Sequence, residues 1–306
     1  MTAPLPAAWK LPRPINRVFI QVRNRRFTAD EFEGFGKGRV AMQSCTKLLP
    51  FAEAMNTENK FARRALELMR VKAFIRGNPD NSPMREVHRR GSRKPIGRYP
   101  SRKIRRSLTW ESVHEREMMW LSEADPAVVA YYDQPHEVTL DLQDYPKPLK
   151  YFPDILRIFA GGGREVIEVK KTQAEINAEK DLDYARKIQL AEMAYRAAGY
   201  QFRVVTAQDD IKIEPVFSNA KAIQRCRFTA TDTLDRLKFH EHLGKTGGAT
   251  TLGGAIRAVS DSHDPFDPVA TAKVYALIVQ REAWIDIRKR LDLNSQITIV
   301  DDSIRI

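Results

Sequence analysis

Cysteine is scarce in this sequence of 306 residues, which contains only Cys45 and Cys226. Two cysteines cannot form a framework of several disulfide bonds, and no Cys-x-x-Cys spacing indicates a structural zinc site. This composition excludes a small disulfide-stabilised domain and favours a reducing compartment.

Long apolar runs are also absent. The first twenty residues contain four prolines and no apolar stretch of the length typical of a signal peptide, and no run of about 18 apolar residues occurs elsewhere. We therefore expect a protein that is neither exported nor membrane-spanning and that works in the cytoplasm, at the nucleoid of a bacterial-type cell.

Acidic residues are outnumbered, and the excess of positive charge is concentrated at one end. The sequence has 51 Lys and Arg against 39 Asp and Glu, which gives a net charge of +12. Residues 1–106 hold 25 basic and 8 acidic side chains, whereas residues 107–306 hold 26 basic and 31 acidic ones. This balance is untypical of an acidic cytosolic enzyme and indicates a polyanion such as DNA as a partner.

The densest basic tract, at 85–106, contains ten Lys and Arg and one acidic residue. A solvated linker can have this composition, but Tyr99 and several Gly and Pro residues interrupt the tract, which favours an arm along a DNA backbone. We expect DNA contacts from Arg89, Arg90, Arg93, Lys94, Arg98, Arg102, Lys103, Arg105 and Arg106.

Changes in composition divide the chain into three segments, 1–106, 107–217 and 218–306. The first segment is expected to be a basic, DNA-contacting region with a helix at 58–75. The middle segment shows the strongest patterns and is expected to carry the chemistry.

The middle segment is predicted to be an α/β fold in which helices flank a mixed sheet. Its second helix has an apolar stripe that includes Tyr184, Ile188 and Tyr195 at helical spacing. The predicted elements are a helix at 111–123, strands at 127–132, 137–142, 150–159 and 164–170, a helix at 174–198 and a strand at 201–206.

The last segment is predicted to be a winged-helix-like interaction domain. Its 13 basic and 11 acidic residues give a charge of only +2, which favours a protein partner, although charge alone does not exclude DNA. The predicted elements are helices at 233–243, 250–259 and 268–280, followed by strands at 284–287 and 296–300.

A candidate catalytic cluster lies on the predicted strands of the middle segment. Because side chains alternate along a strand, Glu168 and Lys170 are expected on one side of the strand at 164–170. A hairpin around 160–163 would bring Asp154 beside Glu168. Neighbouring carboxylates attract a hard divalent cation, and Mg²⁺ suits such oxygen ligands.

The chemistry that such a cluster supports is hydrolysis of a phosphodiester, with one or two Mg²⁺ ions and with Lys170 positioning or activating the nucleophile. Glu115, on the helix at 111–123, is the third predicted acid, because its apolar neighbours would leave a carboxylate in need of a partner.

Alternatives remain open for several of these residues. Glu111 and Glu117 are rivals of Glu115, and Lys171 is a weaker rival of Lys170 because it points to the other face of the strand. Glu168 and Lys170 could also form an ordinary surface ion pair. Gln134 is either a residue beside the site or a polar loop residue, and the histidines His114, His136, His240 and His242 are expected to be structural or solvated.

At these positions the sequence resembles a known family. Glu115, Asp154, Glu168 and Lys170 match the E…PD…ExK signature of the restriction-endonuclease-like PD-(D/E)xK nucleases. The stretch 97–211 further resembles the TnsA-like endonuclease subunit of heteromeric cut-and-paste transposases, and 251–256 and 276–278 do so more loosely. The motifs that carry this resemblance are YPSRK at 99–103, WESVHER at 110–116, DP at 125–126, QP at 134–135, FPD at 152–154 and EVK at 168–170.

The resemblance implies an enzyme that cuts the 5′ ends of a transposon while a separate DDE-type transposase processes the 3′ ends. It implies that Glu115, Asp154 and Glu168 hold Mg²⁺, with Mn²⁺ as a substitute, and that Lys170 is the catalytic lysine. Members of the family can have Gln at the position of Glu168. The carboxy-terminal domain is implied to contact the transposase or an ATP-using regulator.

Two alternatives to this function remain. A restriction or phage-type DNA endonuclease could have the same fold, and a DNA-binding accessory protein could retain the fold with a decayed nuclease site. Loss of metal-dependent cleavage on substitution of Asp154 or Lys170 would separate an active nuclease from a decayed one.

Overall fold

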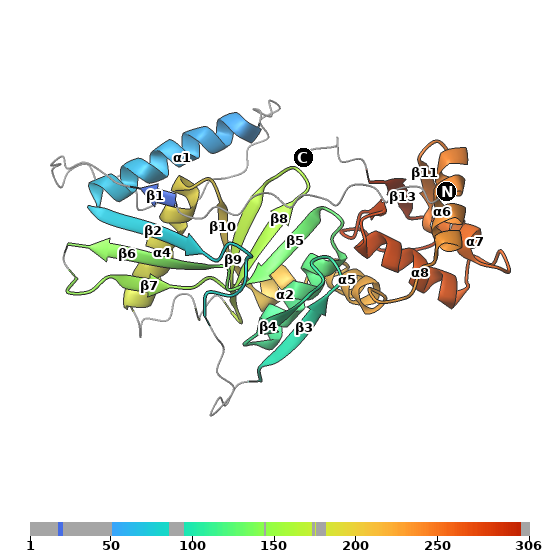
Figure 1. The fold of residues 1–306 in the computed structure, drawn as a ribbon, viewed down its shortest axis with the longest axis horizontal. Coiled ribbons are helices and arrows are strands. Elements are labelled where there is room, and N and C mark those ends of the chain that lie inside the picture. Colours follow the sequence, from blue (N-terminus) through green and yellow to red (C-terminus); the bar gives the residue numbers. More distant parts are fainter. Residues whose placement is uncertain are drawn as a thin grey trace.

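The computed structural model describes residues 18–20, 51–85, 95–143, 145–172, 175 and 182–300. Figure 1 shows an elongated molecule in which strands and helix α1 occupy one end and the helices of the carboxy-terminal part occupy the other. The mixed α/β arrangement agrees with the predicted class and is compatible with a nuclease fold. No helix in the described part of the chain has the length and apolarity needed to cross a membrane.

The sheet that carries the predicted cluster has the strand order β10-β9-β8-β5. Its strands are β5 (Val128–Asp133), β8 (Ile155–Phe159), β9 (Arg164–Lys170) and β10 (Gln201–Thr206). β8 and β9 form the predicted antiparallel hairpin, and β10 runs parallel to β9. The sheet is therefore mixed, as the sequence predicts.

The strand predicted at 150–159 is divided into β7 (Leu149–Tyr151) and β8. Pro153 lies between the two strands, and a proline has no N–H to donate to a strand neighbour. β7 therefore joins the other large sheet, and Asp154 stands immediately before the first residue of β8.

The second sheet has the strand order β1-β2-β6-β7 and contains β1 (Val18–Ile20), β2 (Val71–Gly77) and β6 (His136–Leu142). The helix predicted at 58–75 is wrong in its second half, because α1 (Phe51–Leu68) ends at Leu68 and β2 follows. Val71, Ala73 and Ile75 alternate as buried residues along β2, which is the two-residue period of a strand.

The boundary predicted between residues 106 and 107 does not divide the structure. β2 pairs with β6 along its whole length, and β3 (Gly97–Ser101) pairs with β4 (Arg106–Trp110). Helix α1 also packs against α4 (Leu182–Ala197). The basic composition of the first segment therefore does not mark a separate domain, because its strands are completed by partners far along the chain.

Helix α2 (Val113–Ala124) begins within two residues of the predicted start and packs against β5 and β9 of the sheet that carries the site. The side chain of Ser112 caps it by accepting a hydrogen bond from the backbone N–H of Glu115 at 3.1 Å. Met118 and Met119 are buried in a core that continues into the carboxy-terminal part, where it includes Val274.

The carboxy-terminal part contains the predicted helices and strands together with two elements that were not predicted, α5 (Val216–Arg225) and β11 (Ala249–Thr251). Its small sheet has the order β11-β13-β12. Because one apolar core spans the predicted boundary between residues 217 and 218, this part is packed onto the rest. The remaining elements are α6 (Thr233–Lys245), α7 (Leu252–Val259), α8 (Pro268–Val279), β12 (Ala283–Ile285) and β13 (Gln296–Ile299).

Candidate functional site

Asp154 is fixed at the start of β8 by two hydrogen bonds. Its Oδ2 accepts from the backbone N–H of Val169 at 2.7 Å, and its carbonyl accepts from the backbone N–H of Gln134 at 2.8 Å. Because Ile155 lies opposite Ile167 in the β8–β9 hairpin, Asp154 stands next to Glu168. The structure thus brings together the two carboxylates that the sequence places in one hairpin.

Glu168 is buried and holds Lys170. Lys170 Nζ lies 2.6 Å from Glu168 Oε1, which confirms that the two side chains share one side of β9. The phenol of Tyr184 donates to the same oxygen at 2.6 Å, and the phenol of Tyr151 donates to Oε2 at 2.6 Å. Since the Glu168 side chain is only 5% exposed, the pair is not the surface ion pair of the alternative interpretation.

Glu115 is the acid of α2 that belongs to this cluster. It is 8% exposed, and its Oε2 accepts a hydrogen bond from the backbone N–H of Glu111 at 2.7 Å. The rival Glu111 pairs with Arg85 at 2.6 Å, and the rival Glu117 pairs with His114 at 3.0 Å. Each rival therefore already has a basic partner.

The pKa values of Glu115 and Asp154 are raised by burial and by neighbouring acids. Burial raises the pKa of Glu115 to about 7, and the charges of Glu111 and Glu168 add to this effect. Burial also raises the pKa of Asp154 well above its usual range, with further contributions from Glu168 and Glu115. Like charges close together in a buried place favour the protonated acid, or a bound cation.

Lys170 experiences the opposite balance. Burial alone would lower the pKa of this lysine, but the adjacent Glu168 carboxylate outweighs burial and holds it above its usual range. The Lys170 Nζ also lies 4.8 Å from the centre of the Tyr184 ring. Lys170 is therefore a charged ammonium held in one place beside the acids.

Two acids of the cluster are suited to a metal ion. Within the described residues, Asp154 Oδ1 accepts no hydrogen bond, and the Glu115 carboxylate forms hydrogen bonds only with groups of its own helix start, the Glu111 N–H and the Ser112 side chain, whereas both Glu168 oxygens accept from side chains of other elements. Within the described ranges, no three Asp, Glu, His or Cys side chains are close enough to form a ready metal site. The donor chemistry fits a hard divalent cation held through Asp154 and Glu115, with further positions left to water or phosphate.

Gln134 lies beside the site. Its backbone, in addition to binding Asp154, accepts from the N–H of Met84 at 2.9 Å and has a φ of 41°, in the left-handed region. Its amide, oriented so that both ends find partners, donates to the Arg85 carbonyl and accepts from the Arg85 guanidinium, both at 3.1 Å. Gln134 thereby links Asp154 to Arg85, which lies over the ring of Phe152.

Tyr151 and Tyr184 were not predicted as site residues. The sequence places Tyr184 on the apolar stripe of a helix, which is where it lies, but the stripe does not show that its phenol reaches Glu168. Tyr151 comes from β7, in the other sheet. No local pattern reveals that two phenols from separate elements meet one carboxylate.

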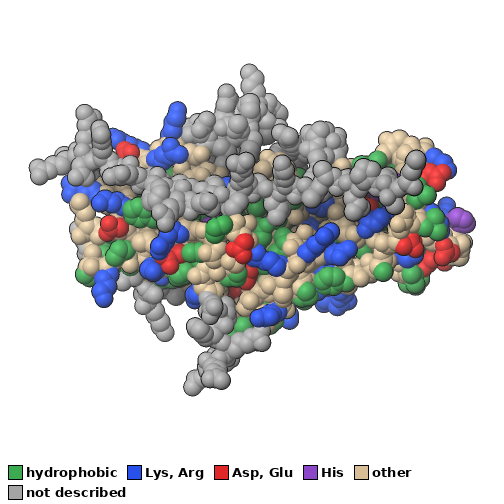
Figure 2. All heavy atoms as spheres, in the orientation of Figure 1, with side chains coloured by type: hydrophobic (Ala, Val, Ile, Leu, Met, Phe, Trp, Pro, Cys, Tyr) green, Lys and Arg blue, Asp and Glu red, His purple; other side chains and the backbone are tan. Residues whose placement is uncertain are grey.

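The predicted DNA-contacting residues fall into three groups. Arg89, Arg90, Arg93 and Lys94 lie outside the described residues, and Arg98, Arg102 and Arg105 are exposed. On the face shown in Figure 2, Lys and Arg side chains are spread over the described surface and interspersed with Asp and Glu. DNA contacts from these exposed arginines stay a prediction.

Lys103 and Arg106, unlike the exposed arginines, donate hydrogen bonds to backbone carbonyls of the fold. Lys103 Nζ donates to three backbone carbonyls, of Ser122, Asp125 and Val128, at the end of α2. Three carbonyls match the three hydrogens of an ammonium. Arg106 donates to the carbonyls of Asp80 and Asn81 at 2.8 and 2.6 Å. Both residues hold the fold together.

The histidines have structural surroundings. His136 is buried with its Nδ1 3.2 Å from the phenol of Tyr195, and burial lowers its pKa to about 4. His240 contacts Glu282 at 3.0 Å, and His242 contacts Thr250 at 2.8 Å.

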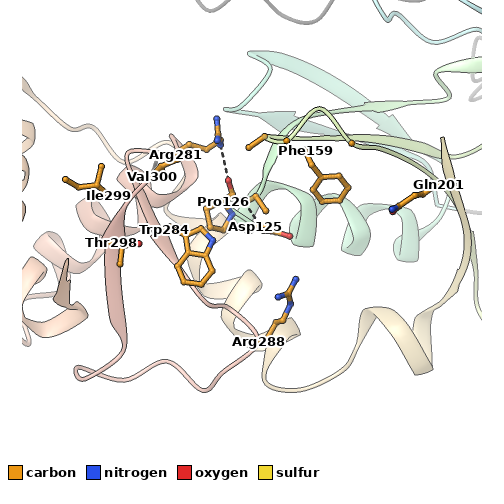
Figure 3. A pocket seen from close by; sticks show the side chains of 14 residues that line it. Asp125, Pro126, Phe159, Gln201, Arg281, Trp284, Arg288, Thr298, Ile299 and Val300 are labelled. Atoms are coloured by element: carbon orange, nitrogen blue, oxygen red, sulfur yellow. Dashed lines mark hydrogen bonds between the residues drawn. The ribbon is translucent and has the colours of Figure 1, made fainter. Parts of the chain in front are cut away.

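A pocket of about 440 Å³ lies where β12 and β13 meet the turn between β8 and β9 (Figure 3). Pro126, Phe159 and Trp284 contribute apolar walls, and Arg281 Nε donates to the Pro126 carbonyl at 2.9 Å across the junction. None of the four predicted catalytic residues lines this pocket. The carboxylate cluster and this pocket are therefore separate places.

A lysine and three acids gathered on a strand hairpin and a helix of a mixed α/β fold define a candidate nuclease. Residues 125–207 match the family model described as TnsA-like endonuclease N terminal. The matched range contains Asp154, Glu168 and Lys170, and Glu115 precedes it. The match supports the assignment to the TnsA-like endonuclease family, and with it a transposase-associated endonuclease. No curated protein matches the chain.

Proposed function

We propose that this protein is the Mg²⁺-dependent endonuclease subunit of a heteromeric transposase and that it hydrolyses phosphodiesters at the 5′ ends of a transposon. The observation that supports this function best is that Glu115 and Lys170 lie near enough to the buried Asp154 for their charges to affect its pKa, next to a family match over the same strands. Transposon-end DNA is the proposed substrate.

The proposed roles follow from the surroundings of each residue. Asp154 and Glu115 would hold Mg²⁺ through their carboxylate oxygens, and Mn²⁺ would substitute because it accepts the same oxygen ligands. The bound ion supplies charge stabilisation for the phosphate. Lys170, whose ammonium is fixed by Glu168, would orient the attacking water and offset the negative charge that develops on the phosphate.

The carboxy-terminal part is proposed to bind protein partners, namely a DDE-type transposase subunit and an ATP-using regulator. Its order of α6, β11, α7, α8, β12 and β13 supports the winged-helix-like prediction. Val274, Leu277 and Ile278 of α8 are buried, so that this face of the helix is unavailable to a DNA groove. Exposed apolar side chains suit a protein contact, and they are Leu234, Leu237, Phe266 and Val269.

The test is cleavage of transposon-end DNA with Mg²⁺, in the presence and absence of a DDE-type transposase as the proposed partner. The parent should cleave at the 5′ ends when the partner is present, and Asp154→Asn should not. Asp261→Asn is the matched control, because Asp261 is a surface acid paired with Lys238 at 2.7 Å.

Each other outcome contradicts part of the proposal. Site-specific cleavage by the parent without any partner would indicate a restriction or phage-type nuclease. If the parent binds the DNA but never cleaves it, with Mg²⁺ or Mn²⁺ and with the partner, the chain is an accessory protein with a decayed site.

A further inference from the structure

Glu168 accepts more hydrogen bonds from side chains of other elements than the other two acids of the cluster do. Asp154 accepts one hydrogen bond within the described residues, from the backbone N–H of Val169, and Glu115 accepts one from the backbone N–H of Glu111 and interacts with the Ser112 side chain. Glu168 accepts from Tyr151 on Oε2 and from Tyr184 and Lys170 on Oε1, all at 2.6 Å.

The number of acceptor positions limits what else Glu168 can bind. An ionised carboxylate has about four lone-pair positions, two on each oxygen. Tyr184 and Lys170 occupy both positions on Oε1, and Tyr151 occupies one on Oε2. Metal binding through both oxygens is incompatible with this arrangement, and a metal on Oε2 would have to share it with a short phenol hydrogen bond.

The donors come from three separate elements, which makes the arrangement rigid. Tyr151 lies on β7, Lys170 on β9 and Tyr184 on α4. The ring of Tyr184 also lies 4.8 Å from Lys170 Nζ, so that the ammonium is held between a carboxylate and an aromatic face. A lysine has a flexible four-carbon chain, and these contacts restrict the positions that its ammonium can occupy.

We propose that Glu168 is a positioning residue for Lys170 and not a metal ligand, and that Tyr151 and Tyr184 hold Glu168 in that role. Metal binding then belongs to Asp154 and Glu115. This inference rests on the proposed nuclease function, and it replaces the metal role that the sequence predicts for Glu168. It also assigns Tyr151 and Tyr184 to the site.

The metal part of the proposal can be tested without any cleavage. Eu³⁺ bound to the full-length protein reports its number of water ligands through luminescence lifetimes in H₂O and D₂O. Glu168→Ala should leave that number unchanged, whereas Glu115→Ala should raise it by about one, because alanine has no oxygen to replace the lost ligand and water takes its place. A water gained in Glu168→Ala, as in Glu115→Ala, would overturn the proposal.

The positioning part is tested by cleavage kinetics of Tyr151→Phe and Tyr184→Phe. Both changes remove only a hydroxyl, so we expect kcat to fall by about 10- to 100-fold, the usual cost of losing such a supporting contact, while KM for DNA stays within about twofold. Tyr200→Phe is the matched control, because Tyr200 is a buried tyrosine whose ring faces Arg164 and His136 instead of Glu168.

Equal kcat values for Tyr151→Phe, Tyr184→Phe and Tyr200→Phe would overturn the positioning role. Failure of the proposed function looks different, because then the parent itself does not cleave DNA. In that case the Eu³⁺ measurement still decides whether Glu168 is a metal ligand.

Discussion

Two regions of the molecule differ in the surroundings that they give to acidic side chains: the strands β8 and β9 with helix α2, and the carboxy-terminal part. Glu115 and Asp154 are buried near other acids, and their pKa values are raised. In the carboxy-terminal part, Lys238 lowers the pKa of Asp261, first through a hydrogen bond, and Lys273 lies 2.6 Å from Asp235. An acid with a raised pKa destabilises a metal-free fold at neutral pH, whereas an acid paired with a lysine stabilises the fold.

Two partly buried lysines give the sharpest comparison between these regions. Lys170 and Lys273 each lie 2.6 Å from a buried carboxylate, and their side chains are 20% and 23% exposed. Lys170→Ala should reduce cleavage by about 10³-fold or more, since groups that stabilise developing charge make large contributions to catalysis. Lys273→Ala should leave kcat unchanged and lower the free energy of unfolding by about 1–2 kcal/mol.

The measurements are single-turnover cleavage of transposon-end DNA and urea unfolding for both variants. If the two substitutions have the same effect on cleavage, the lysine of β9 has no catalytic role and the distinction between the regions is lost.

Substitutions in the basic tract at 85–106 test whether this tract supplies the positive charge that holds DNA near the acidic site. Replacing Arg89, Arg90, Arg93 and Lys94 with Gln should make the slope of log affinity against log salt concentration less steep by about 3–4. Each lost phosphate contact reduces the slope by about 0.9. Deleting residues 1–96 is a poorer experiment, because it removes β2 and so exposes β6.

Fluorescence anisotropy on labelled duplex at several salt concentrations gives the slope. Lys103→Gln is unsuitable as a control because its ammonium holds the end of α2. Lys72→Gln, on the exposed side of β2, is suitable and should leave the slope nearly unchanged. An unchanged slope in the fourfold variant would place DNA binding elsewhere.

The stability of the metal-free protein should respond oppositely to neutralising an acid in each region. The pKa of Glu115 is about 7 in the fold and 4.5 in the unfolded chain, so the fold binds more protons between these values. Stability therefore falls as pH rises from about 4.5 to about 7. Glu115→Gln should remove this fall and raise the free energy of unfolding at pH 8 by about 1–3 kcal/mol.

Asp235→Asn should instead lower stability, because it weakens the contact with Lys273 and the capping box at the start of α6. Urea unfolding in EDTA at pH 5 and pH 8 measures both effects. A loss of stability in Glu115→Gln at pH 8 would contradict the interpretation that the charged Glu115 destabilises the metal-free fold.

Two helix caps give the smallest effect. Ser112 caps α2 through the N–H of Glu115, and Thr251 caps α7 through the N–H of Gly254 at 3.0 Å. Replacing either with Ala should cost about 1 kcal/mol of unfolding free energy. Only Ser112→Ala should also slow cleavage, by a few-fold, because only that cap fixes the backbone of a proposed metal ligand.

Melting temperatures and cleavage rates of the two variants provide the check. Equal cleavage rates would mean that the first turn of α2 does not need its cap to position Glu115.

Local patterns were sufficient for much of the fold. The alternation in β9 predicted that Glu168 and Lys170 share one side, and the glycine-rich turn before β9 predicted the β8–β9 hairpin. The strand β2 was mistaken for a helix, because its apolar residues follow α1 directly and its partner β6 lies about 65 residues later in the chain. Long-range pairing leaves no mark in a short window of sequence.

The sequence by itself determined the types of element, the strand alternation and the acids and lysine of the site, because these depend on side-chain chemistry and on periods of a few residues. Tertiary structure alone decided which acid accepts hydrogen bonds from several elements. Tyr151 and Tyr184 reach Glu168 from different elements, and Lys103 is used inside the fold despite lying in the basic tract. Hydrogen-bond saturation and burial depend on where distant parts of the chain meet, and that is a property of packing.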